Sequence, residues 1–185
     1  MTTDSKQKIK TLDMVYIAVF AVLIAICTWI SIPAVVPFTM QTFAIFLTVG
    51  VLGGKRGSLA ILIYLLLGAI GMPVFSGFQS GISAILGKTG GYIIGFIFSA
   101  LIMWAMEKLL GKKTWVLAVS MVLGMFTYFF IGTIWFMAVY ARDSGAVGLM
   151  TVLGWCVFPF VIPDLIKMAL ALVLSKRMRR IMKIS

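Results

Sequence analysis

A stretch without a single charged side chain runs from Met14 to Gly54. Soluble domains have about a quarter of their residues charged, whereas 11% of this chain is charged and 62% is hydrophobic. The stretch also exceeds the ~7–15 apolar residues of a signal peptide, so we expect no cleaved leader. The chain is therefore predicted to be an integral membrane protein, and its 185 residues suffice for one helical bundle.

Apolar runs alternate with short basic clusters along the whole chain. Each run approaches or exceeds the ~20 residues that a helix needs to cross a hydrocarbon core of ~30 Å. We predict an all-α protein whose six transmembrane helices contact lipid and form a single membrane domain, 1–185. The predicted spans are 12–30, 39–54, 57–71, 91–106, 115–140 and 148–175.

The basic residues predict the orientation of these spans. Thirteen of the sixteen Lys and Arg residues fall at the two termini, between the second and third spans, or between the fourth and fifth. Basic loops are retained on the cytoplasmic side of a membrane. Both termini are therefore predicted to be cytoplasmic. The same distribution explains the net charge of +11, so nucleic acid is not an expected partner.

The residue inventory excludes several kinds of chemistry. The chain has no histidine, which rules out a histidine proton relay, a histidine metal site and a Ser/His triad. Cys27 and Cys156 lie inside apolar spans and lack the spacing of metal ligands. We expect no metal and no cofactor.

Two charged residues of opposite sign lie within the last predicted span. Counted from the basic tail at Lys176, Lys167 lies roughly 13 Å and Asp164 roughly 18 Å into the membrane. At positions i and i+3 they share a helix face and can pair. A structural ion pair is one interpretation. Because intramembrane charges are costly and usually line a cavity or a substrate path, we favour a binding site in the outer half of the membrane.

Other residues of the predicted outer half could complete such a site. Phe75, Phe78 and Gln79 lie in the Gly/Ser-rich connection after the third span, Tyr92 begins the fourth, and Trp135 lies in the fifth. Each aromatic alone is more typical of packing or of interfacial anchoring. Together with an Asp/Lys pair they suit a small amphipathic ligand.

A face of small residues runs along the first span at Ala18, Ala21 and Ala25. Small residues at such spacings let helix backbones approach closely in lipid. The face could hold another helix of the bundle or a helix of a partner protein.

Five blocks of sequence are distinctive in combination. They read VPFTMQTF (36–43), YLLLGAIGMPVF (64–75), TGGY (89–92), GTIWF (132–136) and PFVIPDLIK (159–167). Together they resemble the biotin-specific substrate-binding subunits of energy-coupling factor (ECF) transporters, the BioY family.

The resemblance implies a function and a set of partners. Such subunits have six helices, bind biotin from outside, and are not enzymes. They work in prokaryotic plasma membranes with a transmembrane coupling (T) protein and two ABC-type ATPases. The resemblance also implies that Asp164 and Lys167 contribute to biotin binding and that Gln79 lies where the family has a polar ligand contact. Lys88 stands where proline is often found, and it could contact the ligand carboxylate or face water.

For the small-residue face of the first span, the resemblance favours docking of the coupling protein at Ala21 and Ala25. Which end of biotin meets Asp164 and which meets Lys167 stays open.

Three other functions fit parts of this sequence. A sibling subunit would bind another vitamin, such as thiamine or riboflavin. An intramembrane enzyme would use Asp164 and Lys167 as acid and base, but it needs a nucleophile or activated water beside them. A channel would need polar residues repeated along several helices, and the first five spans lack them.

Overall fold

The structure is a computed structural model that describes residues 11–182, so the basic cluster at Lys6, Lys8 and Lys10 lies outside the described residues. Within that part every regular element is a helix apart from one hairpin of two-residue strands, and the all-α prediction is confirmed. The elements are α1 (Thr11–Trp29), β1 (Ser31–Ile32), β2 (Phe38–Thr39), α2 (Gln41–Leu52), α3 (Gly54–Ala69), η1 (Ser76–Phe78), α4 (Gly81–Leu86), α5 (Gly90–Leu110), α6 (Thr114–Ser144), α7 (Leu149–Cys156) and α8 (Phe158–Met182).

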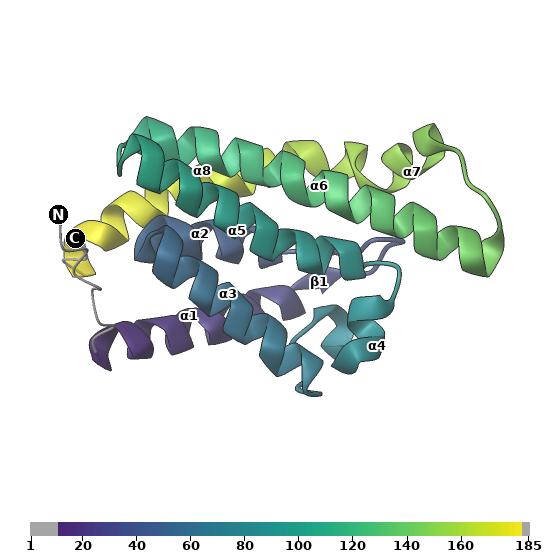
Figure 1. Cartoon of the computed structure of the whole chain (residues 1–185), viewed down its shortest axis with the longest axis horizontal. Helices are drawn as coiled ribbons and strands as arrows, with labels where there is room; N and C mark the ends of the chain where they lie inside the picture. Colours follow the sequence, from purple (N-terminus) through teal and green to yellow (C-terminus); the bar gives the residue numbers. More distant parts are fainter. Residues whose placement is uncertain (1–10, 183–185) are drawn as a thin grey trace, which may run out of the picture.

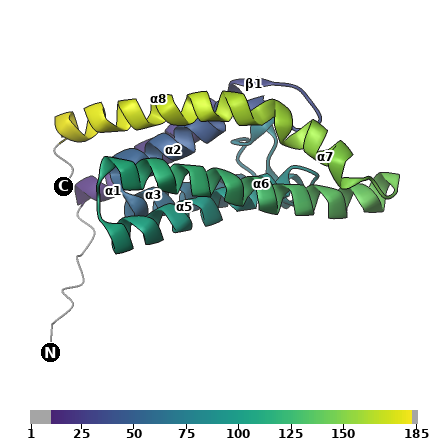
Figure 2. The same cartoon turned by 90° about the horizontal axis from the view of Figure 1, so that it is seen from above.

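The long helices lie along one axis of an elongated bundle (Figure 1). α1 begins and α8 ends at one end of this bundle, whereas β1, α4 and α7 gather toward the other (Figures 1 and 2). α5 and α6 lie side by side in both views, joined by a short turn. The irregular segments are therefore concentrated at the end of the bundle where the candidate site lies.

Four helical segments of the described chain are long and apolar enough to cross a membrane: α1, α5, α6 and α7 together with α8. α2 and α3 have 12 and 16 residues and are shorter than this. The multi-helix membrane character is confirmed. The count of six crossings and the cytoplasmic orientation of the termini stay predictions.

The last predicted span, 148–175, is two helices instead of one. Val157 ends α7 with φ −124° and ψ −61°, and α8 begins at the next residue. Pro159 is the second residue of α8, a position where the missing N–H of proline costs no hydrogen bond. The proline therefore accounts for a new helix start inside an otherwise continuous apolar run.

The turn predicted around Lys55 and Arg56 is tighter than expected. α3 begins at Gly54, so both basic residues lie in its first turn. The chain reverses at Gly53, whose φ of 80° is in the left-handed region that glycine tolerates. The Glu107 carboxylate at the end of α5 accepts a hydrogen bond from the Gly54 N–H and satisfies one of the free donors at the start of α3.

Close helix packing depends on glycine where α5 meets α6. A Cβ atom placed on Gly95 would lie 2.9 Å from Tyr128 Cα, and one on Gly91 would lie 2.2 Å from Trp135 Cβ. These contacts are too short for any larger residue, so the two helices approach along the glycine face of α5. This approach brings Tyr92, Phe96 and Tyr128 toward the same internal space.

The length of α2 decides where that space lies. Twelve residues extend about 18 Å, so α2 covers only part of a hydrocarbon core of ~30 Å. The β1–β2 hairpin and the connection between α3 and α5 occupy the level beyond its first residue, Gln41 (Figure 1). Irregular backbone at membrane depth is tolerated where it lines a cavity, and a cavity is found here.

Candidate ligand-binding site

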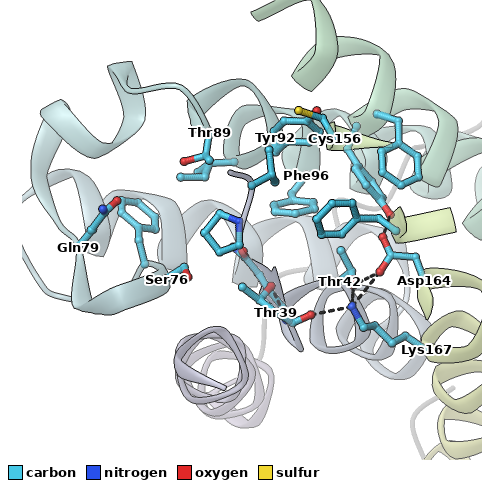
Figure 3. Close-up of a pocket in the computed structure, with 18 residues that line it drawn as sticks. Thr39, Thr42, Ser76, Gln79, Thr89, Tyr92, Phe96, Cys156, Asp164 and Lys167 are labelled. Carbon is cyan, nitrogen blue, oxygen red and sulfur yellow. Dashed lines mark hydrogen bonds and ion pairs between the residues drawn. The ribbon is translucent and has the colours of Figure 1, made fainter. Parts of the chain in front are cut away.

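A cavity of about 680 Å³, counting the space at its open mouth, lies between the start of α2, the connection after α3, α5, α6 and the α7–α8 junction. Asp164 and Lys167 lie at one end of it, whereas Ser76 and Gln79 lie at the opposite end (Figure 3). Apolar and aromatic side chains form most of the wall between these ends. The size and the few polar groups are typical of a site for a small organic molecule.

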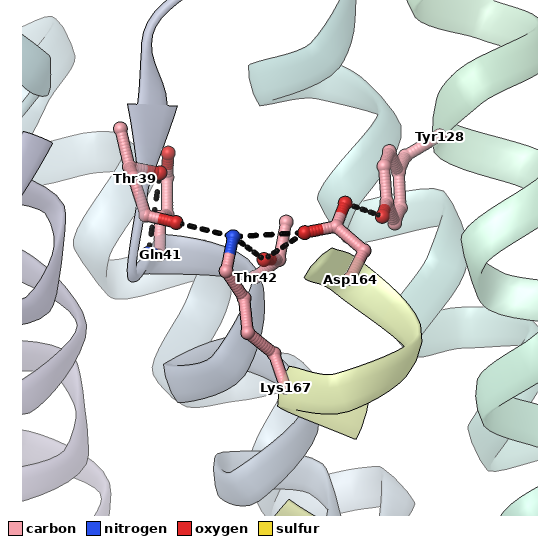
Figure 4. Close-up of polar contacts among 6 residues, drawn as sticks. All are labelled: Thr39, Gln41, Thr42, Tyr128, Asp164 and Lys167. Atoms are coloured by element: carbon pink, nitrogen blue, oxygen red, sulfur yellow. Dashed lines mark hydrogen bonds and ion pairs between the residues drawn. The ribbon is translucent and has the colours of Figure 1, made fainter. Parts of the chain in front are cut away.

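The Lys167 ammonium is fully hydrogen-bonded. It donates to Asp164 Oδ1 at 2.9 Å, to the Thr39 carbonyl oxygen at 2.7 Å and to Thr42 Oγ1 at 3.3 Å (Figure 4). The same nitrogen lies 3.9 Å from the centre of the Phe38 ring. An ammonium group has three donors, so Lys167 has none to spare for a ligand unless one of these partners is displaced.

The Asp164 carboxylate keeps one free acceptor position. Oδ1 accepts from Lys167 and, at 3.0 Å, from the Thr42 hydroxyl, and Oδ2 accepts from the Tyr128 hydroxyl at 2.5 Å. A carboxylate offers about four lone-pair sites, of which these contacts use three. Asp164 lines the cavity yet is only 2% exposed. It can therefore accept one more hydrogen bond, from a donor that enters the cavity.

Four elements meet to build this network. α8 carries Asp164 and Lys167 one turn apart, directly after Pro163. The hairpin pairs Ser31 with Thr39 and so directs the Thr39 carbonyl to the ammonium, while Thr42 lies in the first turn of α2. Tyr128 comes from α6. The pair thus holds together segments that are up to 128 residues apart in sequence.

A second polar network fixes the neighbouring wall. The Tyr64 hydroxyl accepts from Gln41 Nε2 at 2.9 Å, donates to the Val74 carbonyl at 3.2 Å and lies 3.3 Å from Thr28 Oγ1. The Tyr64 ring also meets Phe75 edge to face, with 5.7 Å between centroids. These contacts join α1, α2 and α3 to the connection that carries Gln79.

The structure brings five of the seven predicted ligand contacts to this cavity. Asp164, Lys167, Phe75, Gln79 and Tyr92 all line it. The Tyr92 hydroxyl is buried beside the Thr133 hydroxyl and the Cys156 thiol, and its ring forms part of the cavity wall.

The other two predicted contacts lie outside this wall. The Trp135 indole N–H donates to the Gly87 carbonyl at 3.0 Å and its side chain lies against Gly91. Lys88 lines an adjoining, more open cavity, with its ammonium 5.0 Å from the centre of the Tyr140 ring. In this structure the Trp135 side chain packs against the first turn of α5, outside the cavity wall.

Several residues of the site were not singled out from sequence alone. Thr39 and Thr42 are polar residues inside a long charge-free stretch, which is a signal that could have been used. Tyr128 had no such signal because aromatic residues are common throughout this chain.

The structure places two of the three alanines of the predicted docking face inside the bundle. Ala21 and Ala25 are 1% and 6% exposed, so they pack inside the bundle, and of the three alanines only Ala18 is exposed. Small residues at this spacing admit a neighbouring helix, and here the neighbours are α2 and α3 of the same chain.

Comparison with known proteins identifies the family. The model of the BioY family matches residues 2–184. The chain belongs to the BioY family. Among curated relatives of this BioY-family chain, "Biotin transporter BioY" of Thermotoga maritima is 36% identical over 170 residues, which cover 91% of the chain and 96% of that protein. "Probable biotin transporter BioY" of Pyrococcus horikoshii is 38% identical over 171 residues, covering 92% and 98%.

A solved structure has the same architecture. The crystal structure of the S-component for biotin from an ECF-type ABC transporter matches with a TM-score of 0.81 at 28% sequence identity, covering 97% of this chain and 95% of that one. The family resemblance stated from the five sequence blocks is thereby confirmed.

The satisfied ion pair leads to a prediction about stability. Replacing Asp164→Asn leaves the Lys167 ammonium buried without a counter-charge, and breaking a buried pair in this way costs about 3–5 kcal/mol. The double variant Asp164→Asn/Lys167→Met removes both charges and should recover most of this loss. Thermal unfolding in detergent measures all three proteins. A double variant no more stable than the single one would contradict this account of the pair.

Proposed function

We propose that this chain is the substrate-binding subunit of an ECF-type transporter and captures biotin from outside the cell for ATP-driven uptake. The ATPases would be partner proteins, so the chain itself is a binding protein and not an enzyme. The observation that carries the proposal is the cavity with a satisfied Asp164–Lys167 pair at one end and neutral polar groups at the other. The curated relatives named for biotin transport support the choice of ligand.

The polarity of biotin matches the polarity of the cavity. Biotin has a ureido ring with two N–H donors and a carbonyl, an apolar sulfur ring, and a flexible chain that ends in a carboxylate. The free acceptor on Asp164 suits a ureido N–H. The rings of Phe96 and Phe160 in the wall suit the apolar part.

Electrostatics supports one orientation of the ligand. A carboxylate placed beside Asp164 would meet a like charge, and the Lys167 charge is already compensated by Asp164. At the opposite end, the Gln79 amide, Ser76 and Thr89 offer neutral donors, and Asp164 is the only acid among the described residues lining the cavity. We therefore propose that the ureido ring lies at Asp164 and the biotin carboxylate points to Gln79.

The ligand proposal predicts a specific loss of binding. Asp164→Asn should weaken biotin binding at least about tenfold, since it replaces one of the two acceptor oxygens by an NH2 donor and leaves the buried Lys167 charge uncompensated. Lys167→Ala should act similarly. Isothermal titration of the purified protein in detergent measures the affinity.

Asp13→Asn is the matched control for this measurement. Asp13 also makes an ion pair, 3.2 Å from the partly exposed Arg56, at the other end of the bundle, so its loss should leave biotin binding unchanged. Normal biotin binding by Asp164→Asn would refute the site. Binding of thiamine or riboflavin in place of biotin by the unmodified chain would refute the ligand.

The proposed orientation in a prokaryotic plasma membrane can be tested by labelling. In a chain with Cys27 and Cys156 replaced by serine, Ser76→Cys should react with an impermeant thiol reagent in intact cells, and Lys112→Cys should not. Biotin should protect Ser76→Cys because Ser76 lines the cavity. Labelling of Lys112→Cys alone would mean the reverse orientation.

Docking of the transmembrane coupling protein is proposed on the exposed face of α1 that contains Ala18. Ala18→Trp should retain biotin binding yet fail to co-purify with the coupling protein and the two ATPases, since a bulky ring prevents close helix approach. Leu66→Trp, at an exposed position on α3, is the control. Undisturbed co-purification and uptake with Ala18→Trp would exclude this face.

A further inference from the structure

A second cavity adjoins the first at the same end of the bundle. It holds about 1150 Å³ of empty space, counting its open side. Its own wall comes from the loop of the hairpin, from the residue after Gln79 and from α4, and includes Ala34, Val35, Ser80, Ser83 and Ala84. The proposed biotin site does not use this space.

Three residues line both cavities: Pro37, Gln79 and Thr89. They therefore form a common boundary between the two spaces. Gln79 and Thr89 lie away from the Asp164–Lys167 pair, on the side where the biotin carboxylate is proposed to point (Figure 3). A ligand group attached to that carboxylate would meet this boundary first.

The side chain of Gln79 at this boundary does not discriminate strongly between an acid and an amide. Gln79 carries two N–H donors and a carbonyl acceptor. It can donate to a carboxylate, and it can equally donate to the carbonyl of an amide or accept from the amide N–H. A lysine or arginine there would favour the carboxylate alone, because neither has an acceptor. Lys88 also lines the second cavity, but it is not one of the three boundary residues, and its ammonium lies 5.0 Å from the centre of the Tyr140 ring.

The backbone that carries Gln79 is held in a rare conformation. Gly77 and Phe78 both have positive φ, 66° and 58°, and a bulky side chain rarely adopts such a value. The Phe78 ring packs on Trp29 with 5.3 Å between centroids, and the Trp29 N–H donates to the Pro73 carbonyl at 2.8 Å. Strained backbone of this kind persists where surrounding contacts fix it, typically at functional sites. The contacts around Phe78 therefore hold the backbone that carries Gln79 in a defined position at the boundary.

We propose that the second cavity receives the tail of biotin amides, ligands in which the biotin carboxyl is joined to a small hydrophilic amine such as the side chain of lysine. This inference rests on the proposed function and widens its substrate class from free biotin to its short amide conjugates. The Ser80 and Ser83 hydroxyls would bind the polar groups of the tail, and Ala34, Val35 and Ala84 would pack against its methylene groups.

Affinity measurements on the full-length chain in detergent test the proposal, with biotin and biotinyl-lysine as ligands. The unmodified chain should bind both, with dissociation constants within about tenfold of each other. Ser83→Trp places a ring in the second cavity only, and it should weaken biotinyl-lysine at least about tenfold while changing biotin less than about threefold.

Ile82→Trp is the matched control on the same helix. Ile82 is exposed and lines neither cavity, so this variant should bind both ligands as the unmodified chain does. If Ser83→Trp fails to fold, a second measurement decides. In the chain with Cys27 and Cys156 replaced by serine, biotinyl-lysine should protect Ser83→Cys from a thiol reagent, and biotin should not.

Each other outcome overturns a distinct statement. If the unmodified chain binds neither ligand, the proposed function is wrong. If it binds biotin but not biotinyl-lysine, the proposed function stands and the second cavity does not receive a tail. The same conclusion follows if Ser83→Trp weakens both ligands equally or neither, or if Ile82→Trp has the same effect as Ser83→Trp. It also follows if biotinyl-lysine does not protect Ser83→Cys, or if biotin protects it equally well.

Discussion

The buried contact between the Lys167 ammonium and the Asp164 carboxylate constrains everything around it. Removing two charges from water costs several kcal/mol for each ion, and their attraction repays this only when the remaining donors and acceptors are also satisfied. Thr39, Thr42 and Tyr128 supply these partners from β2, α2 and α6. The hairpin, the first turn of α2 and the middle of α6 are consequently tied to α8. Displacing any of them would leave a buried charge with an unmet hydrogen bond.

The short α2 makes this arrangement possible. A helix long enough to span the membrane would fill the level of Asp164 with side chains. Because α2 starts at Gln41, the hairpin backbone reaches the ammonium instead, and Thr39 can offer a carbonyl oxygen that would already be hydrogen-bonded in the interior of a helix. The glycine face of α5 meanwhile lets α6 approach closely enough for Tyr128 to reach Asp164. Helix length and helix spacing together leave the cavity open.

Sequence reasoning found the parts of this structure that have a strong local signal. Long apolar runs, basic clusters and a rare pair of intramembrane charges all leave such signals, and so the helical class and the Asp164–Lys167 pair could be inferred. The direction in which a side chain points on a membrane helix could not, because apolar residues face both lipid and neighbouring helices. The residues alone therefore left open whether the alanines of α1 face the bundle or a partner. In the structure Ala21 and Ala25 are buried, and the Trp135 indole donates to the Gly87 carbonyl outside the cavity wall. A proline can begin a helix, kink it or end it. Pro159 alone therefore did not reveal that one helix ends at Val157 and another begins at the next residue.

The two ends of the cavity impose different demands on a ligand. At the Asp164 end, Lys167 has no donor left and the carboxylate has one acceptor left, so the proposed ligand must present an N–H there. A site built around such a hydrogen bond rejects analogues that lack the donor far more strongly than an apolar wall rejects a change of shape. At the Gln79 end, a neutral amide can bind an acid or an amide, and the space beyond it is open. In the proposed orientation, selectivity is concentrated at the ureido ring, and the carboxyl end is where the site can accept chemical variety.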